Sequence, residues 1–234
     1  MAFGDLLGNL SITAGSVVTP FNATGSVAVA VGDLVVAVFA QQTALTVTGV
    51  TDNLGNTYTA TNAGTDNGNA TGRCFYSRVT TAGTLTTVAG ACTGSANDAA
   101  FAVSCFAGPF ATSPLDANLA NISDLASPFL CPATGTLAQA DELVIGWGAC
   151  NQGFTTYAAT SPNLLRANVA TANIAAVIGS QVVAATTTVT PTFTDANALS
   201  SSVWGTSTFK KAAGGAAATS LLRAPPSFLH MLIR

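Results

Sequence analysis

Short apolar runs rich in Val, Thr and Phe, bounded by Gly, Asn, Asp or Pro, recur along most of this 234-residue chain. Residues 33–39 and 45–50 are two of these runs. Runs of this length and composition are typical of β-strands, and the Asp, Asn and Gly of residues 51–56 predict a hairpin turn between strands. No segment shows a sustained 3.6-residue period with capping residues, so we expect little helix. The pattern predicts an all-β protein.

The chain also repeats its own order of strands. Three segments of the first half are echoed in the same order in the second half: 32–37 by 140–145, 77–87 by 180–190, and 101–106 by 204–209. Each half alone leaves an apolar face uncovered, so we expect the halves to pack as two sheets of one antiparallel β-sandwich with a double Greek key or jelly-roll-like topology. Chance similarity between Thr- and Ala-rich strands is the alternative explanation.

These observations divide the chain into three parts. Residues 1–24 form an N-terminal arm with a first strand, and residues 25–211 form one sandwich domain, a length that suits a single β unit. Within the domain, the halves are residues 32–108 and 140–211, and the Pro-containing segment 109–139 is the expected crossover and a candidate binding loop.

The third part is a linker and an apolar C-terminal tail, residues 212–234. Its Gly- and Ala-rich start predicts flexibility, and the apolar side chains that follow need a cover. We therefore expect the tail to bind a neighbouring subunit, a partner protein or the outside of its own sheet, whereas a frayed terminus without a role is the alternative. The candidate partner-binding residues are Leu221, Leu222, Phe228, Leu229, Met231, Leu232 and Ile233.

Charge is unusually scarce in this sequence. Asp, Glu, Lys and Arg make up 7% of the residues, against about 25% in an ordinary soluble domain. With a net charge of −3 and a pI near 4.7, the chain cannot assemble a basic groove, so we expect no binding to nucleic acid. Strand faces without charge carry little that repels a neighbour, which indicates a surface that packs against copies or partners.

Neither a membrane span nor a signal peptide is expected. The longest uncharged run, residues 167–194, is interrupted by polar residues and by Pro191, so it does not predict a transmembrane helix. The first residues lack a basic stretch followed by an apolar one, so we expect no secretory signal and synthesis in the cytoplasm.

The sequence offers little catalytic chemistry, and we expect no catalytic residues, no cofactor and no metal site. The single histidine, His230, lies in the tail, which disfavours a serine or cysteine triad. The only glutamate is Glu142, and most aspartates stand in turns, where short acceptors cap backbone amides. Two groups could hold Ca²⁺, although ordinary turn chemistry explains them better: Asp52 with Asn53 and Asn56, and Asp66 with Asn67 and Asn69.

The cysteines and aromatic residues point mainly to the core. The five cysteines form no C-x-x-C pair, so we interpret Cys105 and Cys150 as small buried hydrophobic residues. A Cys74–Cys105 disulfide is the lesser option. Trp147 and Trp204 lie inside strand patterns, which favours core packing. The tyrosines are less constrained by the pattern, and Tyr58 and Tyr157 are the candidates for stacking on a sugar ring.

A resemblance to a known family covers residues 25–211. It is carried by six segments: 32–36 (GDLVV), 50–58 (VTDNLGNTY), 76–83 (YSRVTTAG), 114–116 (PLD), 142–144 (ELV) and the stretch from Trp204 to Lys210. These segments resemble a bacterial and bacteriophage β-sandwich module. The resemblance implies a sandwich found in virion decoration, head-fibre and tail proteins and in repeated modules of secreted bacterial surface proteins, without catalytic residues.

Two functional hypotheses follow from the sequence. The first is a structural virion protein, either a capsid decoration, a head fibre or a tail component, that forms homo-oligomers and attaches to other virion proteins through its termini. The alternative is an extracellular or cell-surface carbohydrate-binding module that adheres to host-surface glycans through Tyr58 and Tyr157.

Overall fold

The computed structural model describes residues 1–14, 20–42, 46–66, 70–93, 98–122, 125–151 and 156–214. All regular structure in these ranges is β, with antiparallel pairing throughout, which confirms the expected antiparallel β-sandwich. The strands are β1 (Leu6–Ala14), β2 (Phe21–Val29), β3 (Leu34–Gln41), β4 (Thr46–Asp52), β5 (Thr59–Asp66), β6 (Ala70–Arg78), β7 (Gly83–Thr93), β8 (Ala99–Phe106), β9 (Phe110–Ile122), β10 (Phe129–Leu130), β11 (Glu142–Asn151), β12 (Ala158–Ala159), β13 (Leu164–Ala170), β14 (Ile174–Val183), β15 (Thr192–Thr194) and β16 (Ser201–Lys211).

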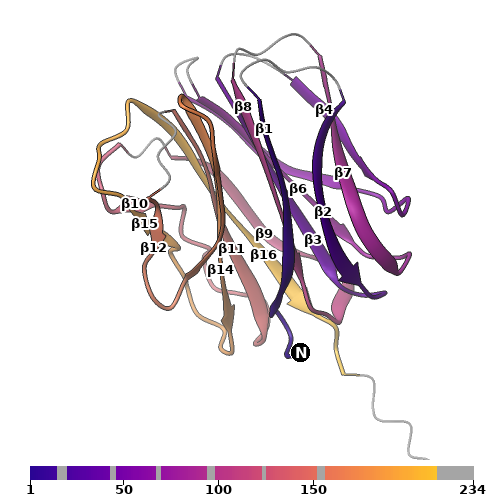
Figure 1. Cartoon of the computed structure of the whole chain (residues 1–234). Coiled ribbons are helices and arrows are strands. Elements are labelled where there is room, and N and C mark those ends of the chain that lie inside the picture. Colours follow the sequence, from indigo (N-terminus) through magenta and orange to yellow (C-terminus); the bar gives the residue numbers. More distant parts are fainter. Residues whose placement is uncertain are drawn as a thin grey trace, which may run out of the picture.

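The first eight strands form one sheet in the order β4-β7-β2-β1-β8-β3-β6-β5. This sheet curls, so that β2, β4 and β7 fold over the inner face of β3, β6 and β8 (Figure 1). The hairpin predicted at residues 51–56 is therefore wrong, because β4 pairs with β7 and β5 pairs with β6. The turn instead joins the two edge strands of the curled sheet.

The second half of the chain builds a five-stranded sheet, β13-β14-β11-β16-β9, and a small sheet, β10-β15-β12. The run β5-β6-β3-β8 in the first sheet has the same connectivity as β13-β14-β11-β16 in the second. The echoed segments of the sequence lie on corresponding strands, β3 with β11 and β8 with β16, and the third pair begins near the ends of β6 and β14. The internal repeat thus has a topological counterpart.

Three apolar cores alternate with the sheets. The first lies inside the curled sheet, the second between its outer face and the five-stranded sheet, and the third between that sheet and the small one (Figure 1). In β3, Val35 and Phe39 enter the first core, whereas Leu34 and Val38 enter the second. A strand buried on both faces needs apolar residues at every position, which explains the continuous apolar run of residues 34–40.

The segment expected to be a crossover loop is partly regular structure. Residues 110–122 form β9, which pairs with β16 at the edge of the five-stranded sheet, and residues 129–130 form β10 of the small sheet. Its prolines did not prevent pairing, since Pro114 lies in an edge strand, where a missing N–H is tolerated.

The two tryptophans occupy reciprocal positions on adjacent strands. Trp147 is paired with Gly205, and Gly148 with Trp204. A Cβ at Gly205 would lie 2.2 Å from Cε2 of Trp147, and one at Gly148 would lie 2.4 Å from Cζ3 of Trp204. Each indole thus covers the glycine opposite it, on opposite faces of the sheet. Both side chains are fully buried, so their predicted place in the core is confirmed.

Candidate functional site

The turn after β4 is held by one carboxylate. Oδ1 of Asp52 accepts hydrogen bonds from the backbone amides of Leu54 (2.9 Å) and Asn56 (3.0 Å). Oδ2 accepts from the side-chain amide of Asn56 (3.0 Å) and from the hydroxyl of Tyr58 (3.0 Å). Both oxygens of this calcium candidate therefore bind groups of the protein, and the interpretation as turn chemistry is confirmed. The second candidate includes Asn67 and Asn69, which lie outside the described residues.

The side-chain amides of this turn bind the segments on either side of it. Oδ1 of Asn56 accepts from the amides of Thr80 (2.9 Å) and Thr81 (3.0 Å), directly after β6. Oδ1 of Asn53 accepts from the amides of Thr86 (2.8 Å) and Thr87 (3.1 Å) in β7. The turn thereby connects the two edges of the curled sheet.

Tyr58 does not offer a free ring to a sugar. Its ring packs against the first core while its hydroxyl donates to Asp52. Burial, followed by the negative charge of Asp52, raises the pKa of the Tyr58 hydroxyl far above its ordinary value. The hydroxyl closes the turn and the ring is only half-buried, so glycan binding by Tyr58 stays a prediction.

Tyr157 is unavailable as a platform. Its side chain is 3% exposed, and its ring centroid lies 6.1 Å from that of Phe129 and 6.3 Å from that of Trp204, in the third core. Burial, followed by the proximity of Cys150, raises the pKa of its hydroxyl. Tyr157 is thus a core residue in this fold.

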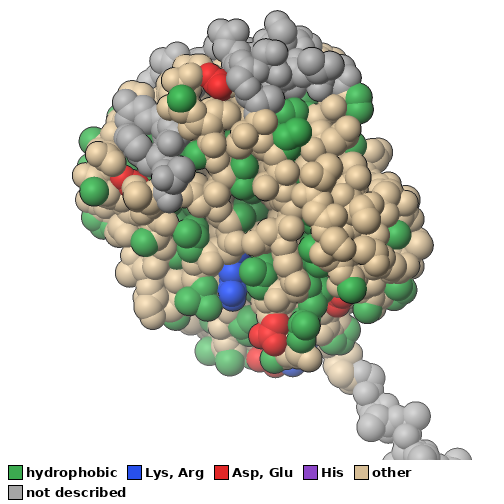
Figure 2. Space-filling view, viewed as in Figure 1, with side chains coloured by type: hydrophobic (Ala, Val, Ile, Leu, Met, Phe, Trp, Pro, Cys, Tyr) green, Lys and Arg blue, Asp and Glu red, His purple; other side chains and the backbone are tan. Residues whose placement is uncertain are grey.

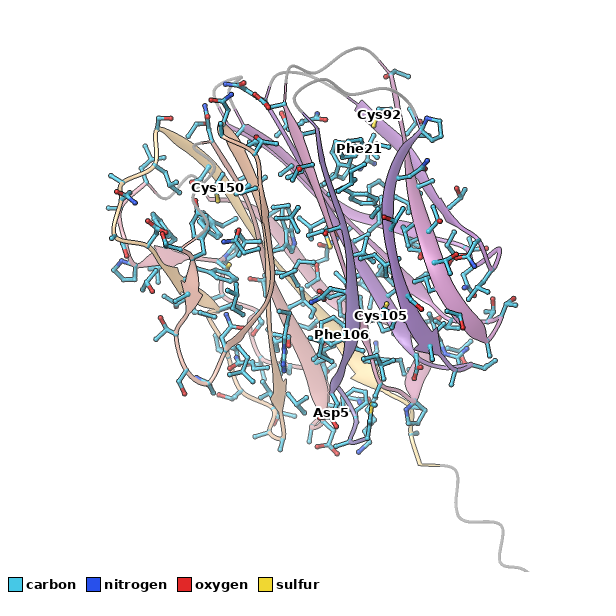
Figure 3. All side chains as sticks on the ribbon, viewed as in Figure 1. Asp5, Phe21, Cys92, Cys105, Phe106 and Cys150 are labelled. Atoms are coloured by element: carbon cyan, nitrogen blue, oxygen red, sulfur yellow. The ribbon has the colours of Figure 1, made fainter. Side chains whose placement is uncertain are left out.

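All five cysteines are buried thiols. Cys74 faces the second core and Cys105 the first, on opposite faces of the same sheet, so the suggested disulfide between them does not form. Cys92 and Cys105 lie in the curled sheet, far from Cys150 in the second half (Figure 3). Burial raises the pKa of the Cys105 thiol to about 12, helped by Asp33. The expected burial of Cys105 and Cys150 is confirmed.

The proposed partner-binding residues of the tail, Leu221 to Ile233, lie outside the described residues, as does His230. In the described ranges, no group of three or more His, Cys, Asp or Glu side chains is placed to hold a metal ion.

Clefts of similar size lie at separate places on the molecule. One of about 370 Å³ lies where β5 and β6 meet the start of β9, beside Tyr76 and Arg78. Another of about 470 Å³ lies beside Asp141 and Lys211, where the described chain ends. A cleft of about 460 Å³ lies between the turn of residues 160–163, the end of β14 and residues 187–190. The sequence did not single out this last cleft, because a Thr-Ser-Pro-Asn segment has the composition of any surface turn.

No protein-family model, curated protein or solved structure matches this chain. Among the described residues, no helix has the length and apolar character needed to cross a membrane.

Proposed function

We propose that this chain is a non-enzymatic structural protein that associates with copies of itself and with partner proteins through uncharged faces. The observation that carries the proposal is the scarcity of charge on the folded surface. The sequence has ten acidic residues, and four of them are less than one-tenth exposed: Asp33, Asp98, Asp195 and Glu142. Figure 2 shows a face on which charged side chains are few among neutral ones.

The edge strand β13 illustrates what such a surface offers to a second copy. Leu164 is 53% exposed and Leu165 37% exposed. The one charged residue of the strand, Arg166, donates from Nε to the hydroxyl of Ser180 at 2.7 Å. Exposed edge strands are usually guarded by lysine or other charges, and the exposed part of β13 has no such guard.

The chemistry of the described residues supports a role other than catalysis. The buried thiols of Cys74, Cys105 and Cys150 have pKa values raised to about 12, chiefly by burial, so they are not nucleophiles at neutral pH. Asp33 accepts hydrogen bonds from the backbone amides of Ala30 and of the distant Gly108, and Asp52 accepts them from backbone amides of its own turn.

The setting that we propose is a virion, as a capsid decoration, head fibre or tail component. This part of the proposal rests on the family resemblance of residues 25–211 and on the apolar tail. The tail residues from Leu221 to Ile233 are proposed to bind another virion protein or a neighbouring subunit.

The first test is the effect of salt on self-association. Sedimentation equilibrium of the full chain at about 0.01 M and about 1 M NaCl compares Debye lengths of about 30 Å and about 3 Å. Contacts between neutral faces predict oligomers whose stability is unchanged or increased in high salt. A monomer at every concentration, or an oligomer that dissociates in high salt, would contradict the proposal.

The second test separates the edge strand from the tail. Leu165→Lys places a charge on β13, and Val31→Lys is the matched control at another exposed apolar residue, 60% exposed. We expect only the first to weaken self-association, and equal effects would exclude the β13 edge as the contact.

A chain ending at Lys211 should keep this self-association but lose incorporation into particles, and equal incorporation of both chains would refute the role of the tail.

A further inference from the structure

We propose that Lys210 and Asp116 condense to an intramolecular amide bond, with Glu142 as the acid–base group that carries protons between them. The three residues lie on neighbouring strands of the five-stranded sheet: Asp116 on β9, Lys210 on β16 and Glu142 on β11. Strand β16 runs between the other two (Figure 1). The reaction takes place once within a single chain, so the inference is independent of the self-association proposed above.

The two groups that would react lie close together and are largely withdrawn from water. Nζ of Lys210 is 3.4 Å from Oδ1 of Asp116, and this oxygen is bonded to Cγ, the atom that Nζ attacks. Reactions between held groups start from separations of about 3–3.5 Å. The Lys210 side chain is 28% exposed and that of Asp116 17% exposed. The other ion pair of the described chain, Lys211 with Asp141, is more open to water, since its side chains are 38% and 48% exposed.

One short segment holds the two carboxylates next to each other. The backbone N–H of Ala138 donates to Oδ2 of Asp116 (3.1 Å), and the N–H of the next residue, Gln139, donates to Oε1 of Glu142 (3.1 Å). Consecutive residues are about 3.8 Å apart at Cα, so the carboxylates that they bind are neighbours. Glu142 also lies directly opposite Lys210 in the pairing of β11 with β16, which places both side chains on one face of the sheet.

Glu142 is suited to transfer a proton. It is the only glutamate of the chain and is fully buried, and Oε2 has no hydrogen-bond partner among the described residues. Burial raises the pKa of Glu142, and the Asp116 carboxylate adds to this effect. The N–H of Gln139, the hydroxyl of Thr208 and the Lys210 ammonium act on this pKa in the opposite direction. A buried carboxyl group whose pKa is raised can accept a proton from an ammonium group and later return it.

No ligand has to enter the site, because every group that reacts belongs to the chain. Directly opposite residues have their Cβ atoms about 5 Å apart, and the flexible stem of Lys210 begins at that distance from Glu142. A rotation of this stem brings Nζ from Asp116 to Oε2 of Glu142 and back.

The reaction balances without an oxidant or a cofactor. The Glu142 carboxylate takes one proton from the Lys210 ammonium, and the resulting amine attacks Cγ of Asp116 to form the C–N bond. Glu142 returns its proton to one oxygen of Asp116, and the nitrogen gives a second hydrogen to the same oxygen. The Cγ–O bond then breaks, water leaves, and the nitrogen keeps its third hydrogen. Ammonium and carboxylate thus become amide and water, and holding the groups together favours a condensation that is unfavourable between free molecules in water.

The bond would fasten the last strand at its end. Lys210 is the residue before the end of β16, and residues 212–234 follow directly. A force applied to residues 212–234 would then load a covalent link to β9 as well as the hydrogen bonds of the sheet.

The test is the mass of the intact, purified full chain under denaturing conditions, followed until it no longer changes. The mass should be lower than that of the sequence by one water molecule. Trypsin cuts after Lys and Arg, so the digest should contain a branched species in which residues 79–166 are joined to residues 167–211. A mass equal to that of the sequence, or separate peptides 79–166 and 167–210, would overturn the proposal.

Single substitutions assign the bond. Lys210→Arg keeps the positive charge but has no reactive amine, so this variant should keep the full mass of its sequence. A loss of water that persists in Lys210→Arg would place the dehydration elsewhere, for instance in a succinimide at an aspartate, and would overturn the proposal. Glu142→Gln has nearly the same shape but cannot transfer the proton, so it should also keep its full mass, and a loss of water there would refute the role of Glu142.

The matched control is Lys211→Arg, in the more exposed ion pair. It should lose one water molecule as the wild type does, because Lys210, Asp116 and Glu142 are unchanged. Full mass in Lys211→Arg would contradict the assignment of the bond to Lys210.

Discussion

Replacing Asn56 by alanine should destabilise the curled sheet, because it removes a buried side-chain amide from the turn that joins the edges of that sheet. Asn56 is 5% exposed. Its Oδ1 accepts from the amides of Thr80 and Thr81 and from the Thr80 hydroxyl, and its Nδ2 donates to Asp52. At about 1 kcal/mol for each of these hydrogen bonds, Asn56→Ala should lower the free energy of unfolding by about 3–4 kcal/mol.

The matched control is Asn53→Ala in the same turn. Asn53 makes a comparable set of hydrogen bonds, to the carbonyl of Thr84 and to the amides of Thr86 and Thr87, but it is exposed. Water replaces exposed bonds, so this variant should lose less than about 1 kcal/mol. The comparison isolates burial, because the residue type and the turn are the same.

The assay is equilibrium unfolding in urea, followed by the fluorescence of the two buried tryptophans. Equal m-values for wild type and variants would show that the same surface is exposed on unfolding, so that midpoints report stability. If Asn56→Ala loses less than about 1 kcal/mol, or no more than Asn53→Ala, the turn does not hold the edges together as we argue.

Three further predictions use the same unfolding assay. Gly205→Ala should lower the free energy of unfolding by about 3 kcal/mol or more, because its Cβ would overlap the buried Trp147. The control Gly49→Ala has nothing within 4 Å of its Cβ and should stay within about 0.5 kcal/mol of the wild type. Equal losses would refute the packing argument. Burial raises the pKa of Glu142 in the fold, so its favourable contribution is present below the ordinary value of 4.5 and is lost as pH rises through the folded value. Glu142→Gln should therefore gain stability relative to wild type between about pH 4 and pH 7, and a difference independent of pH would contradict this. The third prediction concerns alkaline pH and the buried thiols of Cys74, Cys105 and Cys150. The unfolded chain releases the protons of these thiols from about pH 9, whereas the folded chain retains them up to about pH 12. The free energy of unfolding of the wild type should therefore fall steadily from about pH 9 to about pH 12, and a free energy that does not change with pH in this window would show that these thiols are not buried.

The sequence predicted the fold well where the signal is local. Apolar runs of β-forming residues identified the central strands β3 and β11, and the repeat of these runs indicated two sheets that pack together. The placement of Trp147 and Trp204 in the core followed from the strand patterns around them. These features depend on residues close in sequence and on the need to cover an apolar face.

The errors concern relations between distant segments. Residues 51–56 have the composition of a hairpin turn, yet which strands pair depends on the whole sheet, and β4 and β5 lie at opposite ends of its strand order. The residues next to Tyr157 in the sequence have the composition of a loop. Its side chain is buried because the small sheet of β10, β12 and β15 covers it, and the sequence around Tyr157 does not predict that sheet. The burial of Asn163 depends on Gly179 and Phe193, which approach it through the fold rather than through the sequence.

Two buried aspartates of this chain lie in turns, where a neutral side chain would hold the backbone less firmly. Asp33 accepts from the amides of Ala30 (2.7 Å) and Gly108 (2.7 Å), so one carboxylate joins the start of β3 to the segment after β8. Asp195 accepts from the amide of Asn197 (2.9 Å). A charged acceptor gives a hydrogen bond roughly twice as strong as a neutral one. These two carboxylates thus hold loops firmly, and because both are buried they add little charge to the surface that an uncharged partner would meet.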